Sequence, residues 1–331
     1  MLTLFLDAMG GDNAPQATCA GAVMALRADA DLRLILGGIP EVIKQHLTDA
    51  DDVMDRIQIL NAPEIITNNE SAAMAIRQKK ESAVVKGMLM VREGEADGFI
   101  SAGSTGATLV GGMLRLGRVP GIERPALAPV MPGENSEYLL IDCGANVDCR
   151  PEYLAQFGLM GDAYMRKMRR MKSPRIGLVN NGAEEEKGSQ LYIESHKLLK
   201  KEPINFVGNI EARYIPAGQA DVIVCDGFDG NIILKYTEGI ASALMGIIKR
   251  ELMADTRSKL GALLSKPAFK RVKKMMDYTE VGGAPLLGVR GAVVKAHGSS
   301  NAKAIASAIR QATLMARNQV PQAIEENLNK H

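Results

Sequence analysis

Glycine-rich turns that follow apolar runs are the part of this sequence best suited to chemistry. The first lies at residues 6–15 and combines a glycine pair with an amide and two carboxylates, namely Asp7, Gly10, Gly11, Asp12 and Asn13. Pro15 is suited to open a helix, because its missing N–H costs nothing there. A buried strand, a glycine turn and a helix N-terminus together leave backbone N–H groups free to bind an anion. A plain strand–helix turn would explain the same residues, but three further turns of this kind favour an anion site.

Two of these further turns offer hydroxyl and amide donors. Residues 101–108 are small, which permits close backbone approach, and their hydroxyl groups can cap a helix or donate to a phosphate. The candidates in this turn are Ser104, Thr105 and Gly106. In residues 226–231, Asn231 stands at the predicted helix start, where it serves either as an N-cap or as a donor to an oxyanion.

The fourth turn, residues 295–303, leads from a predicted strand into a hydroxyl-rich helix start flanked by two lysines. Its candidate ligands for phosphate are His297, Ser299 and Ser300. A fifth segment, residues 180–188, places three glutamates before Lys187. A solvated helix start explains the glutamates, whereas Lys187 opposes the helix dipole, so a bound anion would account for its position.

The motifs that the sequence lacks narrow the function. No strand is followed by G-x-G-x-x-G, and neither G-x-x-x-x-G-K-[ST] nor G-x-S-x-G is present. A kinase, an NAD-dependent dehydrogenase and a serine hydrolase are therefore disfavoured. The four cysteines form no C-x-x-C pair and are expected to be buried, reduced thiols. Asp142, Asp148 and Asp226 show no metal-ligand spacing, so we expect no metal site and no cofactor.

Length and composition indicate an ordinary globular protein. The chain has 331 residues, 46% hydrophobic and 24% charged, which is enough for one large domain or two closely joined lobes. Met1 leads directly into a strand without a basic flank, so no signal peptide is expected. No apolar run reaches the roughly 18–20 residues of a membrane span. No nucleic-acid partner is expected.

The elements that position the turns alternate between strand and helix. Short apolar runs predict strands at 2–6, 32–36, 57–60, 98–101, 127–131, 138–142, 176–180, 205–207, 222–225 and 292–295. Helical patterns lie at 16–28, 71–92, 152–169, 188–200 and 301–315. This alternation predicts an α/β protein with a mainly parallel sheet between helical layers. Ligands of such sheets bind at the carboxyl ends of the strands, where all the polar glycine turns fall.

These turns resemble the PlsX family of phosphate acyltransferases. The similar stretches are 7–15, 101–106, 141–151, 184–188, 220–235, 282–288 and 295–303, which together span nearly the whole chain. Position 104 departs from the family pattern, since serine stands where asparagine is expected. The resemblance implies a single domain over residues 1–331 with a three-layer α/β/α fold similar to phosphotransacetylase and to the isocitrate dehydrogenase group.

The resemblance also implies an activity and its residues. It implies transfer of a long-chain acyl group from acyl carrier protein to inorganic phosphate, giving acyl phosphate for phospholipid synthesis, by a cytoplasmic homodimer. Lys187 and Asn231 match the family's catalytic residues. Lys187 is expected to bind the charge of phosphate and Asn231 to stabilise the oxyanion or bind phosphate, or these two roles are reversed. His297 and the Ser299–Ser300 pair are weaker candidates for contacts to phosphate or the leaving thiol. Two alternatives are a metal-dependent decarboxylating dehydrogenase on a similar fold and a non-catalytic anion-binding protein.

A basic stretch at residues 249–274 sets one region of the chain apart. It carries a net charge of +7, whereas the whole chain carries only +2. Apolar residues recur in it at helical spacing, which predicts a protruding amphipathic segment over 244–280, formed by two helices joined near Pro267.

The two helices of this segment have different expected partners. Core or dimer packing is the commonest explanation for the apolar stripe of the first helix. At the tip we expect contact with anionic lipid at the inner face of the cell membrane, without spanning it, or with acyl carrier protein. The expected contact residues are Leu260, Leu263, Leu264, Lys266, Phe269, Lys270 and Lys273.

Overall fold

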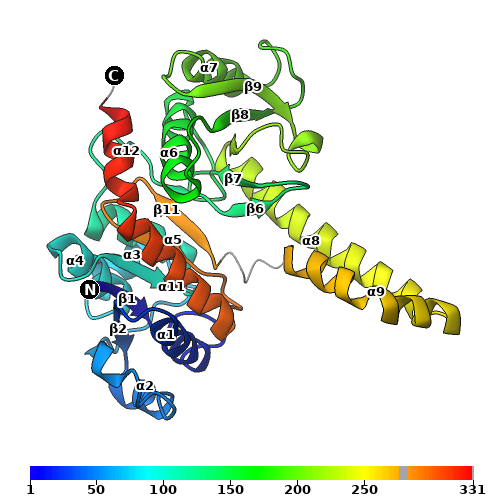
Figure 1. The fold of residues 1–331 in the computed structure, drawn as a ribbon. Helices are drawn as coiled ribbons and strands as arrows, with labels where there is room; N and C mark the ends of the chain where they lie inside the picture. The colour runs from blue at the N-terminus through cyan, green and yellow to red at the C-terminus, as the bar shows by residue number, and fades with distance from the viewer. Residues whose placement is uncertain (276–281, 330–331) are drawn as a thin grey trace.

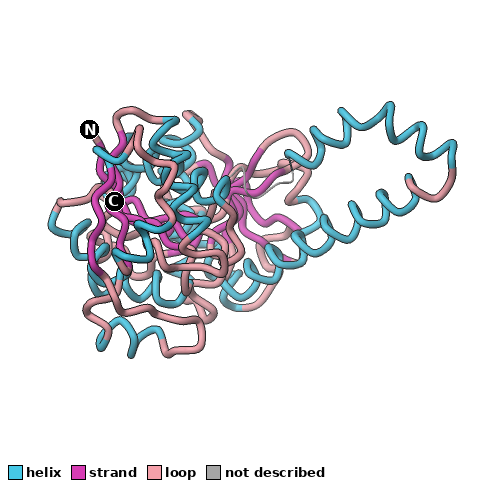
Figure 2. Tube along the Cα trace, turned by 90° about the horizontal axis from the view of Figure 1, so that it is seen from below, coloured by secondary structure: helices cyan, strands magenta, loops and turns pink. Residues whose placement is uncertain are grey.

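Two β-sheets with helices packed around them form the body of the protein, and a pair of long helices projects from it (Figures 1 and 2). This computed structural model describes residues 1–275 and 282–329. The predicted α/β class with mostly parallel strands is confirmed, but the strands divide between two sheets. Among the described helices, none is long and apolar enough to cross a membrane.

The larger sheet has seven strands in the order β3-β2-β1-β4-β12-β11-β5. Their bounds are β1 Leu2–Asp7, β2 Leu32–Gly38, β3 Ile57–Asn61, β4 Gly98–Ser101, β5 Ala126–Leu127, β11 Ala284–Leu287 and β12 Ala292–Lys295. The neighbours from β3 to β12 pair in parallel, and β11 is antiparallel to both β12 and β5.

Alternate residues of these strands supply two hydrophobic clusters. Leu4 and Leu6 of β1 belong to the cluster that includes residues of α1 (Gln16–Ala28) and α11 (Ala302–Arg317). Phe5 belongs to the second cluster, with residues of α4 (Ala83–Glu93) and α5 (Thr105–Gly111). Successive side chains of a strand point to opposite faces of the sheet. Because helices cover both faces of this sheet, both sets of side chains are buried, and the central strands are apolar throughout.

The smaller sheet has five strands in the order β6-β7-β10-β8-β9. Their bounds are β6 Val130–Pro132, β7 Glu137–Ile141, β8 Arg175–Asn180, β9 Asn205–Glu211 and β10 Val222–Val224. All neighbours are parallel except β6 and β7. The flanking helices include α6 (Pro151–Arg169) and α7 (Gln190–Leu199), and α12 (Val320–Leu328) packs on α6. One hydrophobic cluster contains residues of both sheets, so the two parts of the body share a core.

Two predicted elements differ in the structure, and one strand was not predicted. The predicted strand 127–131 is two strands, because the chain leaves the larger sheet after β5 and enters the smaller one at β6. The predicted helix 71–92 is α3 (Ala72–Gln78) followed by α4, since the Ser82 hydroxyl accepts from Val85 N at 3.4 Å and begins a new helix. Strand β11 was not predicted. The remaining short helices are α2 Pro40–Gln45, η1 Met54–Arg56, η2 Gly112–Leu116 and η3 Ala212–Tyr214.

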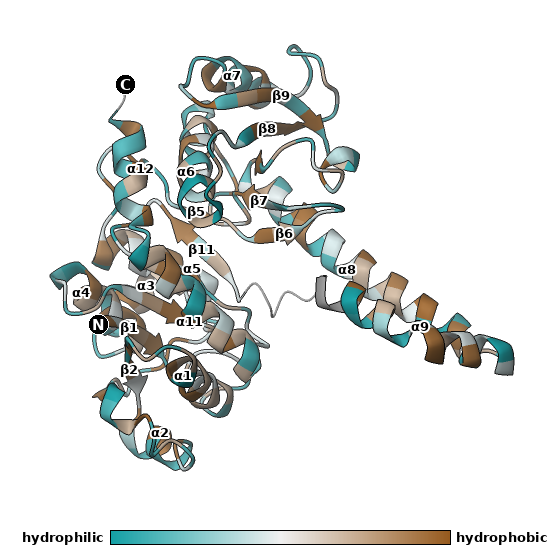
Figure 3. Cartoon of the chain, in the orientation of Figure 1, coloured by the Kyte–Doolittle hydropathy of each residue, from teal (hydrophilic) through white to brown (hydrophobic). Residues whose placement is uncertain are grey.

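The projecting pair of helices consists of α8 (Gly227–Leu252) and α9 (Thr256–Met275), and apolar residues alternate with polar ones along both (Figure 3). The predicted joint near Pro267 is wrong: the helices meet at residues 253–255, where Asp255 accepts hydrogen bonds from the Ser258 backbone and hydroxyl. Pro267 lies inside α9 and is exposed, so water can satisfy the carbonyl that loses its helical partner. Residues 276–280 of the predicted segment lie outside the described residues.

Gly230 and Gly246 give a matched pair of substitutions in α8. A Cβ at Gly230 would overlap the carbonyl oxygen of Asp142, whereas a Cβ at Gly246 would meet no atom within 4 Å. We expect Gly230→Ala to lower the free energy of unfolding by about 1–3 kcal/mol, since backbone must move. Gly246→Ala should raise it by about 0.5–1 kcal/mol, because alanine favours the helix. Chemical denaturation measures both, and equal effects would contradict this packing of α8 on residue 142.

Candidate functional site

The turns after β1, β4 and β12 meet because these three strands are parallel neighbours. Asp12 N donates to Gly298 O at 2.8 Å, and the Asn13 side-chain amide donates to the carbonyl oxygens of Ser299 and Ser300 at 3.1 and 3.2 Å. The first and fourth predicted turns are therefore bonded to each other. Asn13, predicted as a phosphate ligand, uses its amide hydrogens in this structure to hold the two turns together.

The first turn also lies tightly against the second. A Cβ at Gly10 would come within 2.8 Å of Gly103 N, so only glycine fits there. Gly11 has φ +108°, which also favours glycine. The second turn begins α5, where the Ser104 hydroxyl accepts from Ala107 N at 3.3 Å; the predicted capping by Ser104 is confirmed. Close approach of the three turns makes one cluster, which we call the first turn cluster (residues 7–15, 101–106 and 295–301).

A buried carboxylate lies under the first turn cluster. The Ser101 hydroxyl donates to Asp7 Oδ2 at 2.7 Å and accepts from Gly103 N at 2.9 Å. Burial raises the pKa of Asp7, while the hydrogen bonds from Ser101, Met9 and Gly10 and the positive charge of Lys295 oppose that shift. Asp7 therefore fixes the shape of the cluster and places a carboxyl group near a buried lysine.

Lys295, the last residue of β12, is this buried lysine and is only 7% exposed. Its ammonium group donates to the carbonyl oxygen of Ala296. Burial lowers its pKa to about 8; Asp7 and Asp12 oppose the shift and Lys235 of α8 adds to it. From the sequence, this lysine was predicted only to flank the fourth turn. The feature of the sequence that could have indicated its burial is its position as the last residue of an otherwise apolar strand.

The rest of the fourth turn differs in part from prediction. Helix α11 begins at Ala302 with Asn301 as its N-cap, so Ser299 and Ser300 precede the helix and do not start it. Nδ1 of His297 lies 2.8 Å from the Ser299 hydroxyl. The Ser300 hydroxyl is buried and has no hydrogen-bond partner in the described part of the chain. The turn thus keeps one buried polar group free for a ligand or water.

A second turn cluster (residues 142–149, 180–188 and 226–231) lies at the carboxyl ends of β7, β8 and β10, which are neighbours in the smaller sheet. Asp142 is fully buried and accepts from the backbone N–H groups of Leu127, Ala145 and Asn146 at 2.8, 3.3 and 2.7 Å. Burial raises its pKa to about 6, although these donors oppose the shift. Its bonds fix the path of the loop that faces α8.

Asn231 lies inside α8 and not at its N-cap. Asp226 takes the capping position and accepts from Phe228 N at 2.7 Å, so the capping alternative for Asn231 is wrong. A Cβ at Gly144 would lie 3.6 Å from the Asn231 side chain, which places the amide against the loop after β7. Asn231 is exposed and available to a ligand on that side.

Lys187 lies in the neighbouring turn. Its side chain is exposed, and within the described residues it makes no hydrogen bond or ion pair. Helix α7 begins at Gln190, so Lys187 precedes it. Tyr192 of α7 donates to Asp229 and accepts from Asp226 N, which links the turn of Lys187 to the start of α8. The structure thus places Lys187 and Asn231 in the same cluster, after the adjacent strands β8 and β10.

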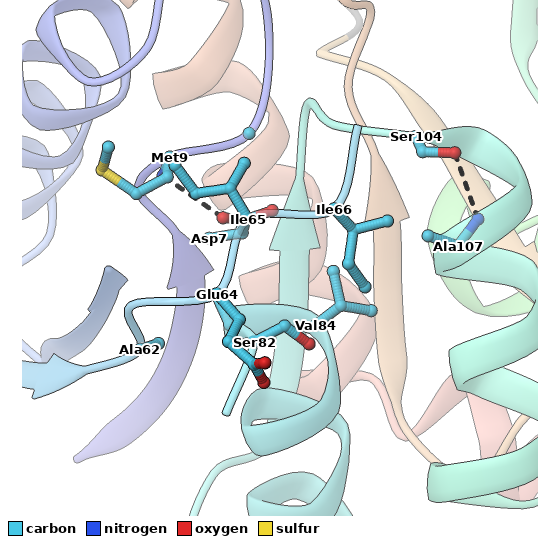
Figure 4. A pocket seen from close by; sticks show the side chains of 12 residues that line it. Asp7, Met9, Ala62, Glu64, Ile65, Ile66, Ser82, Val84, Ser104 and Ala107 are labelled. Carbon is cyan, nitrogen blue, oxygen red and sulfur yellow. Dashed lines mark hydrogen bonds between the residues drawn. The ribbon is translucent and has the colours of Figure 1, made fainter. Parts of the chain in front are cut away.

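Two hollows adjoin the clusters. The crevice between them is lined by strands β5, β11 and β12 of the larger sheet, by α5 and by the loop after β7, through Leu127, Leu286, Lys295, Thr105, Thr108, Leu109 and Ala145. A second hollow beside the first turn cluster mixes apolar and polar walls (Figure 4), and its lining includes Asp7, Met9, Gly10, Glu64, Ile65, Ile66, Ser82, Val84 and Ser104. Gly10 and Ser104 adjoin this second hollow, and Thr105 adjoins the crevice. A ligand held by the second turn can therefore extend to either side.

The histidine, cysteine and acidic side chains of the described residues are the groups that could bind a metal or act as a thiol nucleophile. No group of three or more His, Cys, Asp or Glu side chains lies together there as a metal site. The predicted state of the cysteines is confirmed, since all four are buried and free. Burial raises the pKa of Cys143 and Cys225 well above the usual value, which disfavours the nucleophilic thiolate.

Comparison with protein families and curated proteins gives one consistent result. Residues 2–323 match the family model described as fatty acid synthesis protein. The phosphate acyltransferase of Alkaliphilus oremlandii is 49% identical over 328 residues, which cover 99% of this chain and 98% of that protein. The phosphate acyltransferase of Clostridium acetobutylicum is 47% identical over 329 residues, 99% of each chain.

Solved structures show the same fold at low sequence identity. A phosphotransacetylase from Streptococcus pyogenes superposes with a TM-score of 0.63 and 19% identity over 96% of this chain and 94% of that one. A branched-chain phosphotransacylase from Enterococcus faecalis gives a TM-score of 0.55 and 15% identity, with 96% and 99% coverage. The predicted similarity to the phosphotransacetylase fold is confirmed.

The two hydrogen bonds of Asn13 predict how much this side chain contributes to the stability of the protein. Asn13→Ala removes two hydrogen bonds at a partly exposed position and should lower the free energy of unfolding by about 1–2 kcal/mol. Asn13→Asp keeps the shape but places a carboxylate against two carbonyl oxygens, so it should cost more. Chemical denaturation at neutral pH measures both. An aspartate variant as stable as the wild type would contradict these hydrogen bonds.

Proposed function

The chain belongs to the family of fatty acid synthesis proteins that its sequence resembles and is an acyltransferase, and from this premise we propose that it transfers a long-chain acyl group from acyl carrier protein to inorganic phosphate. One observation carries the proposal in the structure: two turn clusters with polar donors lie on either side of a crevice lined by a buried lysine. That arrangement suits an oxyanion substrate in contact with a second group.

The chemistry needs no activated side-chain nucleophile. An oxygen of hydrogen phosphate attacks the thioester carbonyl, forming a C–O bond and a tetrahedral oxyanion. Collapse of this intermediate breaks the C–S bond and gives acyl phosphate, and the proton of the phosphate passes to the leaving thiol. The enzyme must hold phosphate close to the carbonyl and stabilise the oxyanion. Glycine turns with free N–H groups, hydroxyls and an amide are suited to both tasks.

We assign the site residues in two groups. Lys187 and Asn231, in the second turn cluster, act on the charge that develops at the reacting carbonyl and phosphate. Both side chains are exposed, and the two lie after neighbouring strands, so both can reach a ligand at that end of the sheet. The first turn cluster binds phosphate and the thioester through Gly10, Gly11, Asp12, Ser104, Thr105, Gly106, His297, Ser299 and Ser300. Asn13 supports these ligands by holding the first and fourth turns together.

A coupled assay with purified components tests the reaction. Enzyme, long-chain acyl–acyl carrier protein and phosphate, in excess chelator, should release free carrier protein and form a product that hydroxylamine traps as the hydroxamate. Omission of phosphate is the control. Strict dependence on a divalent cation and a nicotinamide would instead indicate a decarboxylating dehydrogenase, and phosphate binding without turnover would indicate an anion-binding protein.

Alanine substitutions separate catalysis from folding. Lys187→Ala and Asn231→Ala should each lower kcat by on the order of 10²-fold, the usual effect of losing one donor to a developing oxyanion. Stability should change little, since both side chains are exposed. Lys200→Ala is a suitable control, because that lysine pairs with Glu185 on the surface. Normal turnover in both site variants, or their failure to fold, would contradict the assignment.

We further propose that the enzyme is a homodimer. Six large apolar side chains of α8 recur every three or four residues and are 47–69% exposed in the single chain: Phe228, Ile232, Tyr236, Ile240, Leu244 and Ile247. This stripe would be covered by a second copy of the chain, since exposed patches of this kind mark association surfaces. Sedimentation equilibrium should then give about twice the 35.5 kDa of one chain, and Tyr236→Glu should reduce it.

For α9 we propose reversible contact with an anionic membrane surface at the inner face of the cell membrane. Leu260, Leu263 and Leu264 are 62–76% exposed, and Lys266 and Lys270 are also exposed. Phe269 is partly buried, and the side chain of Lys273 lies outside the described part of the chain. Apolar side chains beside basic ones suit a lipid interface, and acyl carrier protein, an acidic partner, is the alternative.

Vesicle sedimentation distinguishes these two partners of α9. Binding should require anionic lipid, weaken with salt, and fall when Leu263 and Leu264 are changed to glutamate. Met24→Glu is a matched control, because Met24 is also exposed but lies on α1 of the body. Vesicle binding that survives the double substitution, together with a raised KM for acyl carrier protein, would identify α9 as a docking site for that protein.

A further inference from the structure

Lys295 carries a buried charged group whose hydrogen-bonding needs the described residues leave largely unmet. An ammonium group has three donors and is costly to bury without partners. Within the described residues, the ammonium of Lys295 donates a single hydrogen bond, to the carbonyl oxygen of Ala296. The side chain is nevertheless only 7% exposed. Two N–H donors of a buried cation are therefore available to another group.

The position of Lys295 limits what that group can be. Lys295 lines the crevice between the sheets, with Thr105 from the first turn cluster and Ala145 from the second. The crevice walls include two hydroxyl-bearing residues, Thr105 and Thr108, but no carboxylate. An anion that enters this crevice would lie against Lys295, between Thr105 of the first cluster and Ala145 of the second.

Charges around Lys295 leave room for one further anion. Asp7 of β1 and Asp12 of the following turn attract the ammonium, whereas Lys235 of α8 repels it. Ser101 and Ala284, its neighbours on β4 and β11, carry no charge. Neither aspartate lies within ion-pair distance of the lysine among the described contacts, so their attraction is incomplete. Binding of a dianion would supply the missing compensation.

We propose that Lys295 binds the phosphate substrate in this crevice, donating its two unpaired N–H groups to phosphate oxygens. The inference rests on the proposed acyl transfer to phosphate and assigns the phosphate charge to a residue outside the pair Lys187 and Asn231. Buried between low-dielectric walls, one ammonium attracts phosphate more strongly than an exposed lysine can. Lys187, which is exposed, is then left to act on the thioester carbonyl or its oxyanion.

Calorimetric titration with inorganic phosphate tests the assignment without turnover. Lys295→Met should raise the Kd for phosphate by about tenfold or more, the usual loss when a buried charge partner is removed. Lys167→Met is the matched control: Lys167 is exposed near the C-terminal end of α6, a helix that packs on the smaller sheet, and its loss should leave the Kd unchanged. Lys187→Ala should lower kcat while changing this Kd less than threefold.

The pH dependence provides a second measurement on the same variants. Because Lys295 loses its proton as the pH rises through about 8, wild-type affinity for phosphate should fall above that pH. Lys295→Met should lack this decrease. A decrease that persists in Lys295→Met would overturn the proposal, as would phosphate affinity that is lost in Lys187→Ala and kept in Lys295→Met.

A further test uses the wild-type protein and therefore does not depend on whether the variants fold. Cyanate is small enough to enter the crevice and carbamylates neutral amines, so Lys295 should react at pH 8.5, and inorganic phosphate should protect it. Mass spectrometry would follow Lys295 with Lys167 as the internal control. Equal protection of both lysines, or none of Lys295, contradicts the proposal. Failure of the acyl-transfer assay alongside phosphate protection of Lys295 would instead refute the proposed reaction and keep the binding site.

Discussion

Parallel pairing of β1, β4 and β12 is the constraint on which the site depends. Since neighbouring parallel strands end at the same edge, three turns separated by nearly the whole chain are forced together there. The hydrogen bonds of Asn13 and Asp12 to the turn after β12 then fix their spacing. β7, β10 and β8 repeat this arrangement in the smaller sheet, and the shared core holds the two clusters on either side of one crevice.

The site concentrates charged groups that are costly to bury, and within the described residues its buried carboxylates have compensating partners that its buried lysine lacks. Asp142 and Asp226 accept backbone N–H groups and so define the loops around the start of α8. Asp7 accepts the hydroxyl of Ser101. Lys295 has only the carbonyl of Ala296 and two aspartates at a distance. Hydrogen-bond donors that are already in place and lack a partner can bind an anionic substrate without rearrangement of the protein.

Much of the fold was predictable, because buried strands and amphipathic helices have their own periodicity. The turns were predictable for the same reason, since glycine and small polar residues after an apolar run have few other uses. The division of residues 126–132 between two sheets could not be predicted, because an apolar run does not indicate which strands it will pair with. The joint predicted at Pro267 was wrong because α9 continues through this proline, although proline costs about 3 kcal/mol in a helix interior. Lys295 was missed as a ligand because its burial depends on strands remote in sequence.

The central claim is that the substrate is held between the two turn clusters. A crystal structure of the enzyme with inorganic phosphate tests this claim most directly. The account predicts phosphate in the crevice, with an oxygen within hydrogen-bond distance of Lys295 Nζ and the side chains of Asn231 and Lys187 on the opposite side. Phosphate bound outside the crevice, or held by the loops of only one sheet with Lys295 still bonded to Ala296 alone, would contradict it.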